Sequence, residues 1–564
     1  MAKDFTRRSF LGLGAMAAVG SVAALGGCAP QQPSATLAET GAEANDTASN
    51  WLGAEPNIAE SEIVSTEETG LLIVGAGTAG LAAAATAADL DLDFMIVDKN
   101  TMVQDTREYF AAVNTKYTKE AGQEVDKIRT MNEIARYSNG RTNRAVLKVW
   151  LDESAECFEW VDALVQQATG KELYLEIAPD LTDHGYFAPT VNHMHAPYYD
   201  GIMRNNVLQQ HIEDAGHTIN FEYKLVKLVH EGEGTRVTGA IFETKDGYVQ
   251  VNARDGVLLA TGGYAANPVM MEALQPQVSK CVTANSYSMM CDGSGIKTAL
   301  WAGAAMDEVP CPMIFNRGAV DVGVDAGYIG EGEDAIFPGT IFQLNMGSQP
   351  FMAVNRNGVR FTNESLPYDN ICNASAMQPG GVFCQVFDGN APADIDRFAQ
   401  AGCARLTTDP IRQGATIDEL CATALEPGVT KKADTIEELA DMLGFAGEAK
   451  QNFLAQVDRY NELFDAQADE DFGKEAYRLS AIRQAPFYGC WYGGSLLTTI
   501  DGLTINEEMQ VLNTEGAVIE GLYAAGDCSG SLFAGTYPEY VVGLACGRSS
   551  TQGRHIARRL AGDL

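Results

Sequence analysis

Three glycines and one acidic residue near the start of the chain have the spacing needed to bind a dinucleotide. Gly75, Gly77 and Gly80 form a G-x-G-x-x-G turn, and Asp98 follows them. In such a turn the first glycine permits a sharp bend, the second lets the backbone approach a pyrophosphate, and the third lets a helix pack closely on a strand. The acid can accept hydrogen bonds from ribose hydroxyls. A glycine-rich turn alone is a weak signal, so the prediction depends on the elements around it.

The segments on either side of these glycines supply those elements. The run 71–74 is apolar and typical of a buried strand, 81–88 is an alanine-rich helical stretch, and 94–97 is a second apolar strand that ends at Asp98. A helix that begins at the glycine turn directs unpaired N–H groups and the positive end of its dipole toward phosphates. The sequence therefore predicts a Rossmann-like α/β domain that binds a dinucleotide.

The length and charge of the chain limit the remaining possibilities. At 564 residues the chain is too long for a single hydrophobic core, and about two to four domains are expected. The formal net charge of −36 argues against nucleic acid as a partner and offers no basic patch to anionic lipids. This charge either forms a solvated acidic surface or attracts a basic electron donor.

The N-terminus resembles a bacterial export signal. Arg7 and Arg8 precede a Gly/Ala-rich apolar run that extends to Gly27, and a twin arginine before such a run is typical of Tat signals. A membrane anchor is the alternative, but glycine and alanine make a poor spanning helix. Cys28 ends a sequence similar to a lipoprotein processing box, so lipidation of Cys28 and simple cleavage both stay open. Residues 29–63 are rich in small and polar residues and are predicted to be a flexible linker.

The cysteines and histidines do not indicate a metal or haem site. None of the 12 cysteines forms a C-x-x-C pair, so no c-type haem is predicted and we expect mostly buried thiols. His184, His193 and His195 lie in an irregular stretch predicted to be a loop, without a third ligand at a standard spacing. An iron–sulfur cluster assembled from distant cysteines stays open.

The rest of the chain returns to the dinucleotide-binding pattern after a long interruption. A helical period covers 143–164, and an apolar strand over 256–260 ends in the small residues 261–263. The stretch 311–481 is irregular apart from a helical portion near 435–464, and a final helix is predicted over 541–560. We therefore predict a discontinuous first domain, 64–310 and 482–564, with a second domain, 311–481, inserted into it.

Six motifs along the chain are similar, in type and order, to those of the fumarate reductase/succinate dehydrogenase flavoprotein family, which includes soluble flavocytochrome c and the 3-ketosteroid dehydrogenases. The motifs are Gly75-x-Gly77-x-x-Gly80 with Asp98, Ala260-Thr261-Gly262-Gly263, Asp292-Gly293-Ser294-Gly295, Arg360-Phe361-Thr362-Asn363-Glu364, Leu522-Tyr523-Ala524-Ala525-Gly526-Asp527 and Gly547-Arg548. The resemblance implies that the cofactor is FAD and that the inserted domain is an α+β cap over the flavin.

The resemblance also assigns residues to the cofactor. The unit from Gly75 to Asp98 takes the adenine half, backbone near Val226 meets the adenine, and Asp527 holds the ribityl or phosphate region. Backbone at Val542 and Gly543 lies under the pyrimidine edge of the flavin. Further cofactor contacts are expected at small or polar residues of the same motifs: Ala76, Thr78, Ala79, Gly80, Lys99, Thr261, Gly262 and Gly263.

Departures from the family pattern argue against fumarate as the substrate. Tyr368 occupies the position of the arginine that acts as the general acid in fumarate reductases, and Tyr537 occupies that of the arginine that binds a substrate carboxylate. Thr498 and Phe315 occupy positions where those enzymes have histidines. A tyrosine cannot supply the charge or the bidentate geometry of an arginine–carboxylate pair. Tyrosines in such positions are instead similar to those of the ketosteroid dehydrogenases.

The two tyrosines suggest a reaction at a C=C conjugated to a carbonyl. We expect Tyr537 to donate to the carbonyl oxygen as enolate character develops, and Tyr368 to exchange the proton at the α-carbon. A phenol, with an ordinary pKa near ~10, is a reasonable acid toward an enolate. Either tyrosine could instead be an aromatic wall of the pocket. Weaker candidates for the site are Tyr540, Glu539 and Arg317.

The sequence thus predicts an exported FAD-dependent ene-reductase acting on an apolar or aromatic enone or a phenylacrylate-type acid. No second G-x-G-x-x-G unit for a nicotinamide donor is visible, so a separate cytochrome or quinol-linked protein is expected to deliver electrons. A ketosteroid-type dehydrogenase running the reverse desaturation is one alternative. An electron-transfer flavoprotein without turnover is the other, and the large inserted domain argues against it.

Overall fold

A computed structural model describes residues 51–104, 109–170, 192–194, 204–286, 288–398 and 404–564. The export signal, the lipidation site and most of the predicted linker lie outside these residues. So do His184 and His195, although the strand β4 (Asn192–Met194) interrupts the loop predicted there. Among the described residues, the helices are too short or too polar to cross a membrane.

The first sheet is built around the strand that leads into the glycine turn. The apolar half of β1 is completely buried between two parallel neighbours, β2 and β8, which explains its uninterrupted run of apolar residues. The strand begins earlier than predicted because its polar first half also pairs with β8. The eight strands are β1 (Ile63–Val74), β2 (Phe94–Val97), β5 (Ile219–Asn220), β6 (Lys224–His230), β7 (Val237–Thr244), β8 (Gly247–Leu259), β15 (Gln510–Leu512) and β16 (Val518–Ala524).

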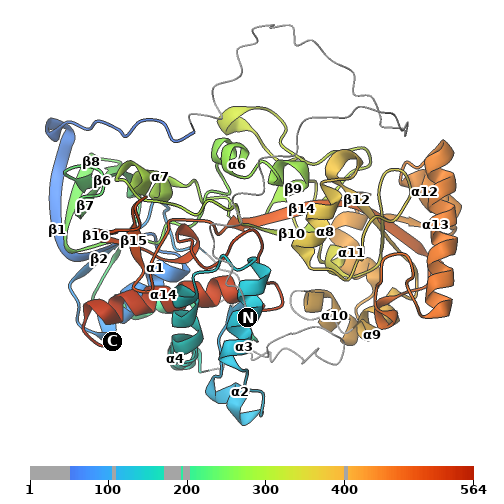
Figure 1. Ribbon diagram of the computed structural model, residues 1–564, viewed down its shortest axis with the longest axis horizontal. Coiled ribbons are helices and arrows are strands. Elements are labelled where there is room, and N and C mark those ends of the chain that lie inside the picture. The colour runs from blue at the N-terminus through green and yellow to red at the C-terminus, as the bar shows by residue number, and fades with distance from the viewer. Residues whose placement is uncertain (1–50, 105–108, 171–191, 195–203, 287, 399–403) are drawn as a thin grey trace, which may run out of the picture. The chain divides into compact units, whose positions relative to one another are not determined.

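Helices from both ends of the chain pack together beside this sheet. The alanine-rich α1 (Thr78–Asp89) lies against α14 (Leu544–Leu560), and Figure 1 shows the two side by side. The helices can approach closely because Gly553 has no side chain. A Cβ at this position would lie 2.9 Å from the carbonyl carbon of Ala79. The other helices up to residue 301 are α2 (Lys116–Glu120), α3 (Lys127–Tyr137), α4 (Arg144–Thr169), α5 (Arg204–Asp214), α6 (Pro268–Leu274) and α7 (Ser294–Trp301).

The C-terminal segments complete the first sheet, as the sequence predicted. The strand β16 pairs in parallel with β8, so residues after 500 join strands from the first half of the chain. A short antiparallel pair, β3 (Tyr109–Ala111) with β4, lies near the start of α14, where the Ala111 N–H donates to the Gly543 carbonyl at 3.1 Å. The predicted α/β fold with a discontinuous Rossmann-like unit is confirmed.

A second sheet of six strands is organised around the long strand β14. Along β12 alternate side chains enter two separate cores, Phe383 and Phe387 on one face and Cys384 and Val386 on the other, so this sheet is covered on both faces. Two of its strands, β9 and β14, come from outside 311–481. The six strands are β9 (Val282–Asn285), β10 (Pro312–Val320), β11 (Met352–Val354), β12 (Phe383–Phe387), β13 (Lys431–Ala433) and β14 (Phe487–Thr499).

Short helices cover this second sheet. The helical portion predicted near 435–464 is two helices, because the chain turns at Gly444 with φ of 83°; Figure 1 shows the pair side by side. The helices are α8 (Tyr368–Ser375), α9 (Ala391–Arg397), α10 (Arg405–Arg412), α11 (Ile417–Leu425), α12 (Ile436–Met442) and α13 (Gly447–Ala466).

Candidate active site

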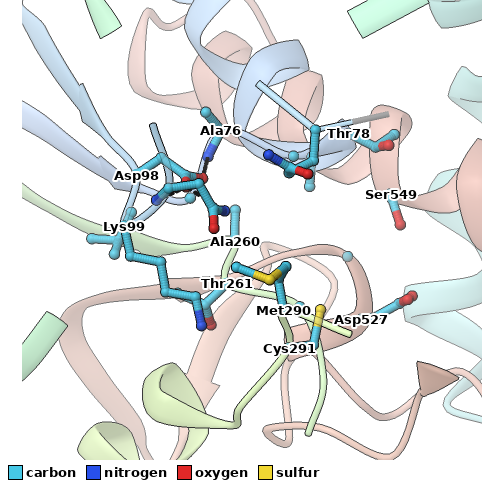
Figure 2. Close-up of a pocket in the computed structure, with 18 of the residues that line it drawn as sticks. Ala76, Thr78, Asp98, Lys99, Ala260, Thr261, Met290, Cys291, Asp527 and Ser549 are labelled. Atoms are coloured by element: carbon cyan, nitrogen blue, oxygen red, sulfur yellow. Dashed lines mark hydrogen bonds between the residues drawn. The ribbon is translucent and has the colours of Figure 1, made fainter. Parts of the chain in front are cut away.

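A cavity of about 380 Å³ opens at the carboxyl ends of β1, β2 and β8. Figure 2 shows Asp98 and Lys99 on one side of it and Asp527 and Ser549 on the other. This is where ligands bind in parallel α/β sheets. Ten of the predicted cofactor residues line the cavity: Gly75, Ala76, Gly77, Thr78, Ala79, Asp98, Lys99, Thr261, Gly262 and Asp527.

The three glycines of the motif meet different surroundings. Gly75 has φ of 108°, and a Cβ there would lie 2.8 Å from the Ala260 carbonyl carbon. A Cβ on Gly80 would collide with the Gly75 carbonyl. Around Gly77, in contrast, a Cβ would have nothing within 4 Å, because this residue faces the cavity at the start of α1. Gly75 and Gly80 therefore allow close packing of the chain. Gly77 leaves the N–H groups at the helix N-terminus accessible, as the binding of a pyrophosphate requires.

Asp98 is held in place by backbone donors. Its carboxylate accepts the Ala76 N–H at 2.7 Å and the Asn100 N–H at 2.8 Å. Beside it, the Lys99 ammonium lies 2.8 Å from Asp292. Burial alone would raise the pKa of Asp292, but Lys99 and the Ser294 N–H hold that pKa below its usual value. This side of the cavity therefore carries a carboxylate fixed by backbone donors and a charge pair between Lys99 and Asp292.

Five predicted cofactor residues do not line the cavity. Gly80 and Gly263 are packing positions, and Val226 lies on β6 next to Leu225, which does line the cavity. Val542 and Gly543 lead into α14, where a Cβ on Gly543 would lie 2.8 Å from the Tyr109 carbonyl carbon.

Sequence reasoning overlooked several side chains in the cavity wall. They include Asn205, Met290, Cys291, Cys546 and Ser549. Two of them adjoin recognised motifs, since Cys291 precedes D-G-S-G and Ser549 follows Gly547-Arg548, so extending those motifs by one residue would have found them. The ten described cysteines are all free thiols, and no group of metal-binding side chains occurs among the residues that the structure describes.

The two predicted catalytic tyrosines lie in another part of the molecule and do not line this cavity. Tyr368 is the first residue of α8 and is 7 % exposed, and Tyr537 in the segment 533–541 is 6 % exposed. The Tyr368 N–H donates to Glu539 at 2.8 Å. The Thr536 hydroxyl also donates to Asp369. These bonds bring the start of α8 and the segment 533–541 together, as the sequence prediction requires.

The tyrosine hydroxyls have protein partners. The Tyr368 hydroxyl accepts the Ala404 N–H at 3.2 Å. The Tyr537 hydroxyl accepts the Ala545 N–H, in the first turn of α14, at 3.2 Å and lies 3.5 Å from the Val541 carbonyl. Tyr537 therefore caps a helix in addition to any role in catalysis.

Two carboxyl groups in this cluster have raised pKa values. Burial raises the pKa of Asp369 to about 6, although Thr536 and backbone N–H groups oppose the shift. Burial and the nearby Asp369 raise the pKa of Glu539 well above its usual range, while Arg317 and Arg478 oppose this. Both acids are therefore protonated more readily than exposed carboxyl groups.

The weaker candidates divide between two places. The guanidinium of Arg317, on β10, lies 5.0 Å from the centre of the Phe315 ring and 5.7 Å from that of Tyr368. The Phe315 and Tyr368 rings meet edge to face at 5.1 Å. Tyr540 packs instead against Tyr137 of α3, with ring centres 4.8 Å apart. Arg317 and Glu539 therefore accompany Tyr368, and Tyr540 points to another helix.

Residues 70–543 match the FAD binding domain family. The vinyl phenol reductase of Lactiplantibacillus plantarum is 26% identical over 87% of this chain and 96% of its own. A fumarate reductase (cytochrome) of Shewanella frigidimarina is 24% identical over 86% of this chain and 75% of its own. In structure, the chain is similar to a 3-ketosteroid-delta4-(5alpha)-dehydrogenase from Rhodococcus jostii, with TM-score 0.65, 19% identity and coverage of 90% and 99%.

Proposed function

The chain belongs to the FAD binding domain family, and from that premise we propose that it is an ene-reductase whose substrate is not fumarate. It is an FAD-dependent oxidoreductase related to fumarate reductases, vinyl phenol reductase and ketosteroid dehydrogenases. The observation that carries the proposal is the junction of α8 with the segment 533–541, where two buried tyrosines stand in place of the arginines of fumarate reductases.

The cavity at the glycine turn would hold the cofactor. The bare helix start at Gly77 and Thr78 would receive the pyrophosphate, and the fixed carboxylate of Asp98 would accept the ribose hydroxyls. Asp527, whose carboxylate lies 3.2 Å from the buried Arg548 guanidinium, would face the ribityl region. Bound FAD would supply a hydride to the β-carbon of a C=C conjugated to a carbonyl, with two electrons returned by a separate donor.

The tyrosines would complete the reduction. The Tyr537 hydroxyl would turn from the Val541 carbonyl, at the limiting distance of 3.5 Å, and donate to the substrate oxygen as negative charge develops. The Tyr368 hydroxyl would give its proton to the α-carbon and regain one from solvent. One hydride and one proton saturate the double bond, so the reaction consumes two electrons and two protons in total.

An anaerobic assay with reduced viologen dye tests the proposal. Purified protein with one extractable FAD should oxidise the dye in the presence of an aryl enone, a cinnamate or a vinyl phenol, and not with fumarate. The vinyl phenol is included because the vinyl phenol reductase of Lactiplantibacillus plantarum is similar to 87% of this chain. Rapid turnover of fumarate, or no turnover with any activated alkene, would contradict the proposal.

Export is a further part of the proposed function. The twin arginine Arg7-Arg8 supports Tat-dependent export, after which electrons would arrive from a cytochrome or a quinol-linked protein. Cell fractionation of the full chain beside Arg7→Lys/Arg8→Lys tests this. The wild-type chain should leave the cytoplasm and the double variant should stay; equal distribution would refute export by this signal.

A further inference from the structure

A buried arginine near the tyrosines has a hydrogen-bond donor without an acceptor. Arg317 is only 1 % exposed, and its Nε donates to the Ser348 hydroxyl at 2.6 Å. That hydroxyl lies 3.3 Å from the Asn316 side-chain oxygen, so the guanidinium is held from one side. Its Nη2 is buried and lacks a hydrogen-bond partner in the described part of the chain. A buried donor left unpaired is costly, which makes this atom a candidate for binding a ligand.

The surroundings of Arg317 favour an anionic ligand. The guanidinium lies against the Phe315 and Tyr368 rings rather than against a carboxylate. Glu539 is near enough for Arg317 to lower its pKa, but its carboxylate accepts a hydrogen bond from the Tyr368 N–H. A buried guanidinium beside apolar rings is stabilised most by an anion that accepts its hydrogen bonds, such as a carboxylate.

We propose that Nη2 of Arg317 binds the carboxylate of the substrate, which makes the substrate an unsaturated monocarboxylic acid with an aromatic body. This inference rests on the proposed ene-reductase function. The rings of Phe315 and Tyr368 flank the guanidinium and would pack on the aromatic body. The other buried arginine of the cluster, Arg478, donates to the backbone carbonyls of Phe398 and Ser365, so one arginine is left for one carboxylate. The replacement of two fumarate reductase arginines by Tyr368 and Tyr537 therefore argues against a dicarboxylate substrate, but a monocarboxylate could still bind to Arg317.

The first test uses the wild-type holoenzyme and needs no variant. The visible spectrum of bound FAD is followed while the protein is titrated with 3-phenylpropionate, a saturated product analogue, and separately with its methyl ester. We expect the acid to bind at least tenfold more tightly than the ester, because only the acid offers an anion to Arg317. Equal affinities would overturn the inference.

The second test uses graded substitutions of the arginine and its support. Arg317→Gln should raise the KM for cinnamate at least thirtyfold and leave the KM for its methyl ester within about twofold. Arg317→Lys keeps the charge without the planar fork and should give an intermediate rise. Ser348→Ala removes only the partner of Nε and should raise the KM for cinnamate about fivefold. FAD content and Tm show whether each variant is folded.

The outcomes separate this inference from the proposed function. Equal losses of cinnamate and ester turnover in Arg317→Gln would make Arg317 a structural residue and refute the inference, while the ene-reductase function stands. A wild-type enzyme that reduces the ester but not the acid would do the same. A wild-type enzyme that reduces neither, but reduces an aryl enone or a vinyl phenol, would also refute the inference alone. One that reduces no activated alkene would refute the proposed function as well. If Arg317→Gln fails to fold, Arg317→Lys and the titration decide.

Discussion

The cavity at the glycine turn and the cluster around Tyr368 are built from opposite materials. The cavity wall consists mostly of backbone and small side chains at the ends of parallel strands. Two glycines of the turn, Gly75 and Gly80, leave no room for a side chain beside neighbouring backbone. The tyrosine cluster consists of large and charged side chains from β10, α8 and the segment 533–541, joined by side-chain hydrogen bonds. Adding atoms should therefore damage the first region, and removing atoms should damage the second.

The largest effect is expected from Gly80→Val. Its side chain would collide with the Gly75 carbonyl and push α1 away from β1, an overpacking that costs about 1–3 kcal/mol or more. We expect the purified variant to contain less than about a tenth of the wild-type FAD and to melt several degrees lower.

Gly77→Ala is the matched control for that variant. A Cβ at this position meets nothing within 4 Å, and φ of −87° suits any residue, so the apoprotein should melt like the wild type. The methyl group would nevertheless face the pyrophosphate, and FAD affinity should fall about tenfold. Equal behaviour of the two variants would show that the glycines do not divide into packing and ligand-facing positions.

The next largest effect is expected from Tyr368→Phe. Loss of a proton donor lowers kcat by roughly 10²–10⁴-fold, whereas FAD content should not change because Tyr368 does not line the cofactor cavity. Stopped-flow reoxidation of the reduced enzyme by cinnamate measures the step. The control Tyr488→Phe removes a hydroxyl on β14 that donates to Asp418 at 2.8 Å, and it should retain kcat within twofold. An unchanged rate in Tyr368→Phe would assign the proton to another group, with Glu539 the first candidate.

The same contrast explains what the sequence could predict about the fold. The turn at 75–80 is recognisable in the sequence because Gly75 and Gly80 make close backbone contacts that a side chain would prevent. The fully buried β14 was not predicted. It contains glycines at 489, 493 and 494, shows no alternation, and pairs with four strands that are distant in sequence. Local pattern cannot identify such partners, so two strands of the second sheet were assigned to the first domain.

The candidate site was predictable to a similar, partial extent. Motif alignment located Tyr368 and Tyr537, and the structure brings their segments together; their roles in catalysis remain predictions. The unpaired Nη2 of Arg317 depends on Ser348 and Tyr368, which lie 31 and 51 positions further along the chain. The electrostatics of Glu539 likewise depend on burial and on Asp369. Such properties arise only when the chain has folded.

A smaller effect is expected from Tyr537→Phe, because this hydroxyl has two functions. Removing an oxyanion-type donor lowers kcat by roughly 10²–10³-fold, and the Ala545 N–H at the start of α14 loses its acceptor, which costs about 1 kcal/mol. Urea unfolding of the holoprotein and single-turnover kinetics measure the two separately. A loss of stability without loss of rate would leave Tyr537 as a helix cap only.

The smallest effect is expected at Asp501, two residues after the end of β14. Its buried carboxyl accepts the Tyr264 hydroxyl at 2.6 Å and the Gln275 amide at 2.9 Å, and burial raises its pKa to about 7. An unfolded aspartate ionises near ~3.9. Between these values the folded chain holds one more proton than the unfolded chain. Stability should therefore fall as pH rises from about 4 to about 7 and level off above.

Asp501→Asn isolates this contribution because the amide keeps an acceptor for Tyr264 and cannot ionise. Differential scanning calorimetry from pH 5 to 8 should show the Tm of the wild type falling with pH by roughly 1–3 °C more than that of the variant. Burial also raises the pKa of Asp307 to about 7, and Asp307 raises the pKa of Asp501. The difference between the two curves therefore reports Asp501 together with its coupling to Asp307. Parallel curves would mean that Asp501 is ionised in the folded protein, and that it binds Tyr264 and Gln275 as a carboxylate rather than as a neutral acid.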